Sequence, residues 1–256
     1  MRILAIGDVI GRPGRRALRS LLPGLRLEFS LDLVIANGEN AAGGVGLTPD
    51  TAQELLQDGV DCLTTGNHIW DHKEIIPHMD GPMPIIRPLN FPPGVPGRGY
   101  LKIGNALIVN LMGRTFINPL DCPFRTMDNL LAGIPASQKV IVVDLHAEAT
   151  AEKQAMGWYL DGRVSAVFGT HTHVGTVDTR VLPGGTAYVT DLGMVGPENS
   201  IIGDEKTSVI DRFVRRMPHR MTVGEGPNVF NAVVIDIDDQ TGKARSITRV
   251  DRKSTG

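Results

Sequence analysis

This sequence has few cysteines and few aromatic side chains, and it has no large excess of charge of either sign. The only cysteines are Cys62 and Cys122, without a CxxC spacing, which excludes a disulfide framework and favours a reduced, cytoplasmic protein. The formal net charge is -2, so bulk charge provides no attraction to the backbone of nucleic acids. No apolar run approaches the roughly 18 residues that a membrane helix needs, and the run before Asp8 is too short for a signal peptide. We therefore expect no membrane partner.

Apolar material is nevertheless sufficient for a globular core. Hydrophobic residues make up 41% of the 256 residues, and charged residues 21%, which excludes a disordered chain. There is no internal repeat, low-complexity tract or clear linker. We expect one domain that spans residues 1–256.

Short runs rich in Val, Ile and Leu alternate with helical patterns. The runs predict buried strands at residues 2–6, 31–36, 62–65, 139–145 and 164–168, and a hairpin around Gly104-Asn105. Helices are predicted at residues 15–29, with Pro23 indicating a kink or an early stop, at 48–58 and at 150–159. Residues 252–256 are expected to form a frayed tail. This order is typical of an α/β fold with a mixed sheet or two sheets.

Polar side chains of metal-ligand type follow five of the predicted strands. Ligands of α/β sheets bind just beyond the carboxyl ends of the strands, so these side chains can converge on one site. They are Asp8, Glu39 with Asn40, Asn67 with His68, His146, and His171 with His173. In an extended segment, His171 and His173 point in the same direction, so both imidazoles can reach that site.

The number of these side chains exceeds what one tetrahedral ion takes. Two ions with a shared carboxylate and a shared water suit seven ligands, namely Asp8, Glu39, Asn40, Asn67, His146, His171 and His173. Mixed imidazole, carboxylate and amide ligands suit iron, manganese, zinc or nickel. Two divalent ions contribute +4, while Asp8, Glu39 and a bridging hydroxide contribute -3. The remaining +1 favours an anionic substrate such as a phosphate ester.

These motifs resemble the calcineurin-like metallophosphoesterases. The resemblance rests on Gly7-Asp8, on Gly66-Asn67-His68, on His146 and on the segment from Gly169 to His173. Three further segments resemble the bacterial YmdB-like subfamily, and they begin Asn37-Gly38-Glu39-Asn40, Phe124-Arg125-Thr126 and His146-Ala147-Glu148. The resemblance runs from residue 1 to about residue 250.

Three positions depart from the pattern of the broad superfamily. Asp8 is followed by Val9-Ile10 where the superfamily has Asp-x-His, and Glu39-Asn40 replaces its second motif. Ile69 follows His68, where an acidic residue is usual. The YmdB-like subfamily shares these changes, so they place the chain within the superfamily.

The resemblance implies a four-layer α/β/β/α sandwich, with two mixed β-sheets flanked by helices, and a phosphodiesterase for 2′,3′-cyclic nucleotides such as 2′,3′-cAMP. It implies that Glu39 bridges two ions, of which one takes Asp8, Asn40 and His173 and the other takes Asn67, His146 and His171. The ions are expected to be iron, with manganese and zinc as alternatives. A metal-bridging hydroxide then attacks phosphorus, and His68 protonates the leaving oxygen as the general acid.

Several of these residues also have simpler interpretations. His68 alone suits a packed turn histidine, and His171 with His173 suits a solvated pair on an edge strand. Asn40 and Asn67 are of a type that is common in turns. The convergence of five strand ends favours the metal site over these separate explanations.

Asp144 raises a further question because it shares a strand face with His146. It is either a ligand itself or a residue that supports one, and the sequence leaves both interpretations open.

Two rival functions remain open from the sequence. A phosphomonoesterase or a nuclease would use the same site with different loops, whereas a metal-bound regulatory or RNA-interaction protein would show little catalysis. A serine esterase is excluded because there is no GxSxG segment. The expected partners are a small phosphodiester, an RNA-related ligand and further copies of the chain in a homo-oligomer.

Overall fold

Two β-sheets form the centre of the protein in the computed structural model, which describes residues 1–218 and 222–255. The strands of the first sheet are β1 (Arg2–Val9), β2 (Leu33–Asn37), β3 (Cys62–Thr64), β10 (Met194–Pro197), β11 (Asn228–Ile237) and β12 (Ala244–Ser254). The strands of the second sheet are β4 (Tyr100–Ile103), β5 (Ala106–Met112), β6 (Val140–His146), β7 (Ala166–Thr170), β8 (Arg180–Val181) and β9 (Ala187–Val189). The strand orders are β12-β11-β10-β1-β2-β3 and β4-β5-β6-β7-β9-β8.

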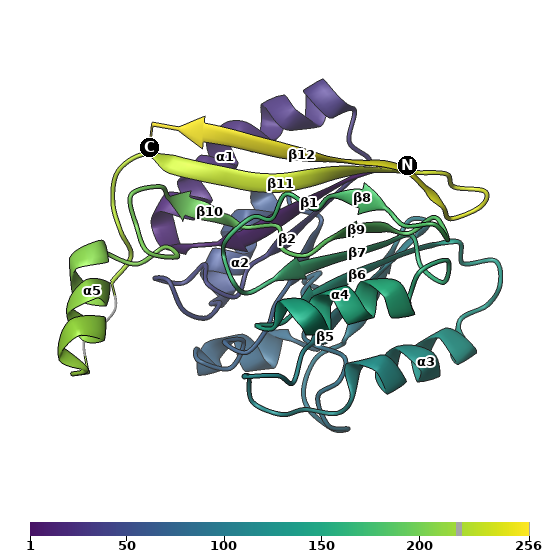
Figure 1. Ribbon diagram of the computed structural model, residues 1–256, viewed down its shortest axis with the longest axis horizontal. Helices are drawn as coiled ribbons and strands as arrows, with labels where there is room; N and C mark the ends of the chain where they lie inside the picture. Colours follow the sequence, from purple (N-terminus) through teal and green to yellow (C-terminus); the bar gives the residue numbers. More distant parts are fainter. Residues whose placement is uncertain (219–221, 256) are drawn as a thin grey trace.

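Helices cover the outer faces of both sheets (Figure 1). The described helices are α1 (Gly11–Phe29), α2 (Pro49–Gln57), a 3-10 helix η1 (Lys73–His78), α3 (Pro123–Gly133), α4 (Thr150–Tyr159) and α5 (Lys206–Arg215). Helices α1 and α2 pack on the first sheet, and α3 and α4 pack on the second. The four-layer α/β/β/α sandwich with two mixed sheets is therefore confirmed.

The central strands of both sheets each contribute to two hydrophobic cores. In β1, Ile3 and Ala5 pack between the two sheets, whereas Leu4 and Ile6 face α1 and α2. Successive side chains of a strand point to opposite faces, so a strand that is covered on both sides needs apolar residues at every position. This is why the strands next to the site are short, uninterrupted runs of Val, Ile, Leu and Ala.

The direction of the central strands gives the site its position. Strands β1, β2 and β3 run parallel in the first sheet, and β5, β6 and β7 run parallel in the second. Their carboxyl ends therefore lie at one edge of each sheet. Strand order and direction, rather than proximity in the sequence, bring residues 8, 39, 67, 146 and 171 to that edge.

Two local predictions were wrong, the early stop at Pro23 and the frayed tail. Helix α1 continues through Pro23 to Phe29, because Pro23 is exposed and water can bond the carbonyl that its missing N–H leaves free. The tail expected at residues 252–256 is ordered as far as Ser254, because β12 pairs antiparallel with β11 along its whole length. The hairpin at Gly104-Asn105 is confirmed by the pairing of β4 with β5.

None of the helices in the described part of the chain is long and apolar enough to cross a membrane.

The first turn of α2 is held by a capping box. Thr48 Oγ1 accepts a hydrogen bond from the Thr51 N–H at 3.2 Å, and Thr51 Oγ1 accepts one from the Thr48 N–H at 3.0 Å. We expect Thr48→Ala to lower the free energy of unfolding by about 1 kcal/mol, because the Thr51 N–H in the first turn of the helix loses its acceptor. Urea unfolding followed by circular dichroism measures this. Gln53→Ala, at an exposed position of the same helix, is the control, and equal stability of the two variants would contradict the assignment.

Candidate metal centre at the carboxyl ends of the two sheets

All eight of the predicted site residues lie at the carboxyl ends of strands. They are Asp8 on β1, Glu39 and Asn40 after β2, Asn67 and His68 after β3, His146 at the end of β6, and His171 and His173 after β7. The first sheet supplies the carboxylates and amides, and the second supplies three imidazoles. The site therefore lies where the edges of the two sheets meet, and no single layer contains it.

The first group of contacts is centred on His146. Its Nε2 atom lies 2.9 Å from Asn67 Oδ1, 2.9 Å from Glu39 Oε1 and 3.0 Å from His171 Nδ1. Ligand atoms of Glu39, His146 and His171 all lie within 4.8 Å of one another. Four potential ligands thus converge on one small volume.

The orientation of His146 is fixed from behind by β7. Its Nδ1 lies 3.0 Å from Thr170 Oγ1, and the Thr170 hydroxyl in turn donates to Asp144 Oδ1 at 2.8 Å. Since the Thr170 proton is used on Asp144, Nδ1 of His146 donates to Thr170, and Nε2 faces the site. Asp144 also accepts a hydrogen bond from Thr64 Oγ1 at 2.5 Å. It therefore supports His146 through Thr170 rather than reaching the site itself.

Burial shifts the pKa of Asp144 and that of His146, and the neighbours of each side chain oppose the shift. Burial raises the pKa of Asp144 to about 7, although the hydroxyls of Thr64 and Thr170 oppose the shift. Burial alone would lower the pKa of His146, but the negative charge of Glu39 raises it above its ordinary value. A single proton on Nε2 can bond only one of the neighbouring acceptor atoms, whereas a metal ion can accept lone pairs from all of them.

A second group of contacts is centred on His173. Its Nε2 atom lies 3.5 Å from Asp8 Oδ1 and 3.2 Å from Asn40 Nδ2, while its Nδ1 donates to the Ile202 carbonyl at 2.7 Å. Burial would raise the pKa of Asp8, but the charges of His173 and His146 and the hydrogen bond from the His171 N–H together outweigh burial and lower the pKa. The same pairing raises the pKa of His173, which burial alone would lower. The two side chains therefore attract each other strongly.

Unpaired oxygen atoms show that these residues fit a cation. Asp8 Oδ1 and Glu39 Oε1 are buried and receive no hydrogen bond from any of the residues 1–218 and 222–255. A buried, unpartnered carboxylate oxygen is costly, by several kcal/mol in order of magnitude, unless a cation lies against it. One such oxygen belongs to each group of contacts. The donor set of imidazole, carboxylate and amide suits transition-metal ions.

His68 lies beside these two groups and not within them. Its backbone N–H donates to Glu39 Oε2 at 3.1 Å, while its ring Nδ1 lies 2.7 Å from Asp71 Oδ2. The side chain is half-exposed and lines a cavity of about 350 Å³ that also exposes Glu39, His171 and His173. The hydrogen bond to Asp71 leaves Nε2 as the nitrogen available for substrate.

Asp71 and Glu148 were not identified as site residues from the sequence. The His68-x-x-Asp71 spacing was a readable signal, because residues three apart in a turn can meet. Glu148 Oε2 lies 3.0 Å from His171 Nε2 and so fixes which ring nitrogen of His171 turns toward His146. Glu148 lay within a segment used for the family resemblance, but nothing local indicated its partner.

A buried ion pair under the histidine turn also escaped sequence analysis. Lys153 of α4 is 2% exposed, and its Nζ donates to Asp191 Oδ2 at 2.6 Å. The same oxygen accepts a hydrogen bond from Thr172 Oγ1 at 2.7 Å, between the two histidines. Since Asp191 and Lys153 are far from Thr172 in the sequence, only the fold could reveal that they hold this turn.

The expectation of an extended segment from His171 to His173 was wrong. Strand β7 ends at Thr170, and both histidines have positive φ angles, 96° for His171 and 62° for His173. Such angles cost a non-glycine residue of the order of 1–3 kcal/mol and occur where the surroundings impose them. The bend, together with the hydrogen bonds around it, turns the two imidazoles toward different groups of contacts.

Comparison with known proteins gives matches over nearly the whole chain. The model of a family described as YmdB-like protein matches residues 4–250. A 2′,3′-cyclic-nucleotide 2′-phosphodiesterase of Bacillus subtilis is 51% identical over 254 residues, which are 98% of this chain and 96% of that protein.

Two solved structures also match nearly the whole chain. A hypothetical protein from Thermus thermophilus has a TM-score of 0.92 and 46% identity, with 99% of each chain covered. A phosphatase from Mycoplasma pneumoniae has a TM-score of 0.93 and 31% identity, with 100% of this chain and 94% of that chain covered.

Gly66 is the residue that allows the strand ends to approach so closely. A Cβ atom at this position would lie 2.2 Å from His146 Cδ2 and 2.5 Å from Glu39 Oε2. We expect Gly66→Ala to displace both side chains, to destabilise the fold by roughly 1–3 kcal/mol and to lower bound metal and turnover together. Elemental analysis of the purified variant measures the metal.

The matched control is Gly24→Ala in α1, where nothing lies within 4 Å of the added carbon. It should retain metal and turnover. Full metal content in Gly66→Ala would show that the metal does not depend on this close approach.

Proposed function

The chain belongs to the YmdB-like protein family, and we propose that it is a metal-dependent phosphodiesterase that hydrolyses 2′,3′-cyclic nucleotides. The observation that carries the proposal is the pair of buried carboxylate oxygens, Asp8 Oδ1 and Glu39 Oε1, facing imidazoles at an open cavity. A substrate of this kind brings a singly charged phosphodiester, which suits a site that keeps a small positive charge once cations are bound.

The ligand assignment follows the two groups of contacts. We propose Asp8, Asn40 and His173 for one ion, and Asn67, His146 and His171 for the other, with Glu39 between them. This division is supported by the distances around His173 Nε2 and around His146 Nε2. When bound, the two ions neutralise phosphate charge and lower the pKa of water in the site. Iron is the proposed metal, with manganese and zinc as alternatives, because the donor set mixes nitrogen and oxygen.

His68 is proposed as the general acid. Its Nδ1 donates to Asp71 Oδ2 at 2.7 Å, so in the doubly protonated imidazolium the second proton lies on Nε2, faces the cavity and can be passed to the leaving ribose oxygen. We propose that the P–O2′ bond breaks, as the name of the Bacillus subtilis relative states for that protein. Water adds to phosphorus and gives up one proton to solvent, while O2′ takes the Nε2 proton of His68, which solvent later replaces. The product is a nucleoside 3′-phosphate.

A phosphomonoesterase on the same site is the second candidate, because the Mycoplasma pneumoniae relative is described as a phosphatase. A nuclease would again use this site. A regulatory or RNA-interaction protein with little catalysis would have no use for a proton donor positioned by a carboxylate, so the His68–Asp71 pair argues against that class.

A cytoplasmic location is also part of the proposal. Cys62 and Cys122 are both free thiols, as is usual in reducing compartments. The homo-oligomer remains a prediction.

Phosphorus NMR of 2′,3′-cAMP tests the substrate and the bond that breaks. With the metal-loaded protein, we expect conversion to adenosine 3′-phosphate alone, and no conversion after chelation and removal of metal. A panel with a phosphomonoester and an oligonucleotide separates the rival activities. Turnover of the monoester alone would replace the proposal with the phosphatase.

Paired variants separate metal binding from proton transfer. We expect Glu39→Ala to lose both ions together, because Glu39 lies between the two groups. His68→Ala should keep its metal and lose about 10²–10⁴-fold in kcat, the usual contribution of a general acid. Asp71→Asn should keep the metal and lose less. The control is His78→Ala on the exposed surface, and metal-loaded His68→Ala with undiminished kcat would remove His68 as the acid.

A further inference from the structure

Helix α5 projects from the sandwich and contributes little to its cores (Figure 1). Val209 is the one residue of α5 that is fully buried, whereas Phe213 is 72% exposed. A groove of about 880 Å³ lies between α5 and the preceding turn, and its lining includes Ile202, Val209, Arg212, Phe213, Arg216 and Met217. We call it the α5 groove. It is more than large enough for a nucleotide-sized ligand.

The α5 groove borders the cavity of the metal centre. Ile202 lines both spaces, and its carbonyl holds His173 Nδ1 at 2.7 Å. Ile202 has a φ of 50°, which a β-branched residue rarely adopts, so this junction is built at a cost. Asp204 also lines the cavity and interacts electrostatically with both His173 and Arg212. A ligand that starts at the metal centre can therefore extend along α5.

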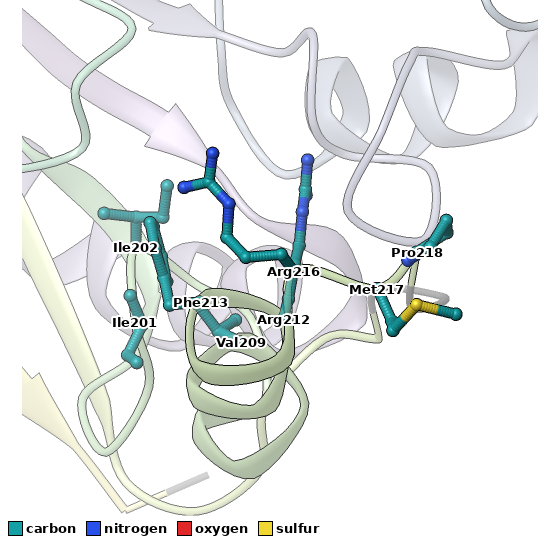
Figure 2. Close-up of a pocket in the computed structure, with 8 residues that line it drawn as sticks. All are labelled: Ile201, Ile202, Val209, Arg212, Phe213, Arg216, Met217 and Pro218. Carbon is teal, nitrogen blue, oxygen red and sulfur yellow. The ribbon is translucent and has the colours of Figure 1, made fainter.

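The chemistry of the groove suits a nucleotide and its phosphate. Arg212 and Arg216 extend from α5 in the same direction, with Ile202 facing them from the turn (Figure 2). The lining contains these two guanidinium groups and no acidic side chain. By contrast, Arg215 lies outside the groove and is paired with Asp211 at 2.6 Å. An exposed aromatic ring next to guanidinium groups is a common platform for a base and a phosphate.

A cyclic mononucleotide would leave this chemistry unused, because its only phosphate is held at the metal centre. We propose that the α5 groove binds the next nucleotide on the 5′ side, so that the substrate is the 3′ end of an RNA strand that carries a 2′,3′-cyclic phosphate. The proposal rests on the proposed phosphodiesterase function and adds the class of substrate. Arg212 and Arg216 contact the internucleotide phosphate, and the neighbouring base stacks on Phe213. The reaction remains hydrolysis of the P–O2′ bond, with an RNA 3′-phosphate as product.

A second copy of the chain is a poorer occupant of this face. The described part of α5 and its cap carry Lys206, Arg212, Arg215 and Arg216 against Glu205 and Asp211. Two such helices packed face to face would bring like charges together, whereas a polyanion is attracted.

The test compares kcat/KM for two substrates, 2′,3′-cAMP and the dinucleotide ApA with a 2′,3′-cyclic phosphate. We expect the metal-loaded protein to favour the dinucleotide by about tenfold, a typical gain from one stacked base or one charged contact. In the double variant Arg212→Gln/Arg216→Gln the ratio should fall toward one, and Phe213→Ala should lower it partly. The ratio cancels any effect of a substitution on folding or metal content.

Arg215→Gln is the matched control, because it removes the same charge from the same helix outside the groove. It should keep the wild-type ratio. Equal kcat/KM for the two substrates in the wild type, with 2′,3′-cAMP hydrolysed, would overturn the inference and leave the phosphodiesterase intact. If the metal-loaded wild type hydrolyses neither substrate, the proposed function itself is refuted.

Light scattering tests the alternative occupant of the same face. An oligomeric state that is the same in the wild type and in Phe213→Ala supports the inference. A dimer that dissociates in Phe213→Ala, with no change in the substrate ratio, would assign the α5 face to a second copy and overturn it.

Discussion

Two carboxylates, Asp8 and Glu39, are fully buried at the ends of adjacent strands and raise each other's energy by repulsion. Each keeps one oxygen without a hydrogen-bond partner among the described residues. A fold tolerates such a pair only when positive charge is held against it, so this constraint explains the imidazoles that β6 and β7 bring to the same edge. The negative charges of this pair raise the pKa of His146 above its ordinary value and that of His173 to about 9, against the effect of burial.

The surroundings of this pair are built to keep the ligand atoms in place. Asp144 and Thr170 hold His146 from inside the second sheet, while Lys153 and Asp191 hold the turn that carries His171 and His173. The turn itself stores backbone strain, and Gly66 removes the Cβ that would separate His146 from Glu39. These features use buried polar groups and unusual φ angles that reduce stability on their own. They are acceptable because three apolar cores on either side of the sheets supply the folding energy.

The side of the site that faces solvent is formed by exposed turns instead of buried strand ends. His68 and Asp71 are half-exposed, and Ile202 also lines the cavity in front of them. The groups that must meet a substrate thus lie on a turn after a strand. The same carbonyl of Ile202 that orients His173 also borders the α5 groove, so the metal centre and the surface proposed for the rest of the substrate share one structural element.

The sequence by itself determined strands β1 to β7, helices α1, α2 and α4, and the set of candidate ligands. Buried strands have a strong local signal, because a strand that is covered on both faces must be apolar throughout, and a polar residue directly after it marks its end. The family resemblance supplied the sandwich. Tertiary structure alone decided that Asp144 supports His146 through Thr170, that Glu148 contacts His171, and that Lys153 reaches Asp191. Those contacts join residues of different strands and helices, so no local pattern encodes them. The extent of β12 was likewise decided by its pairing with β11, because an exposed edge strand has too little apolar character to be distinguished from a tail.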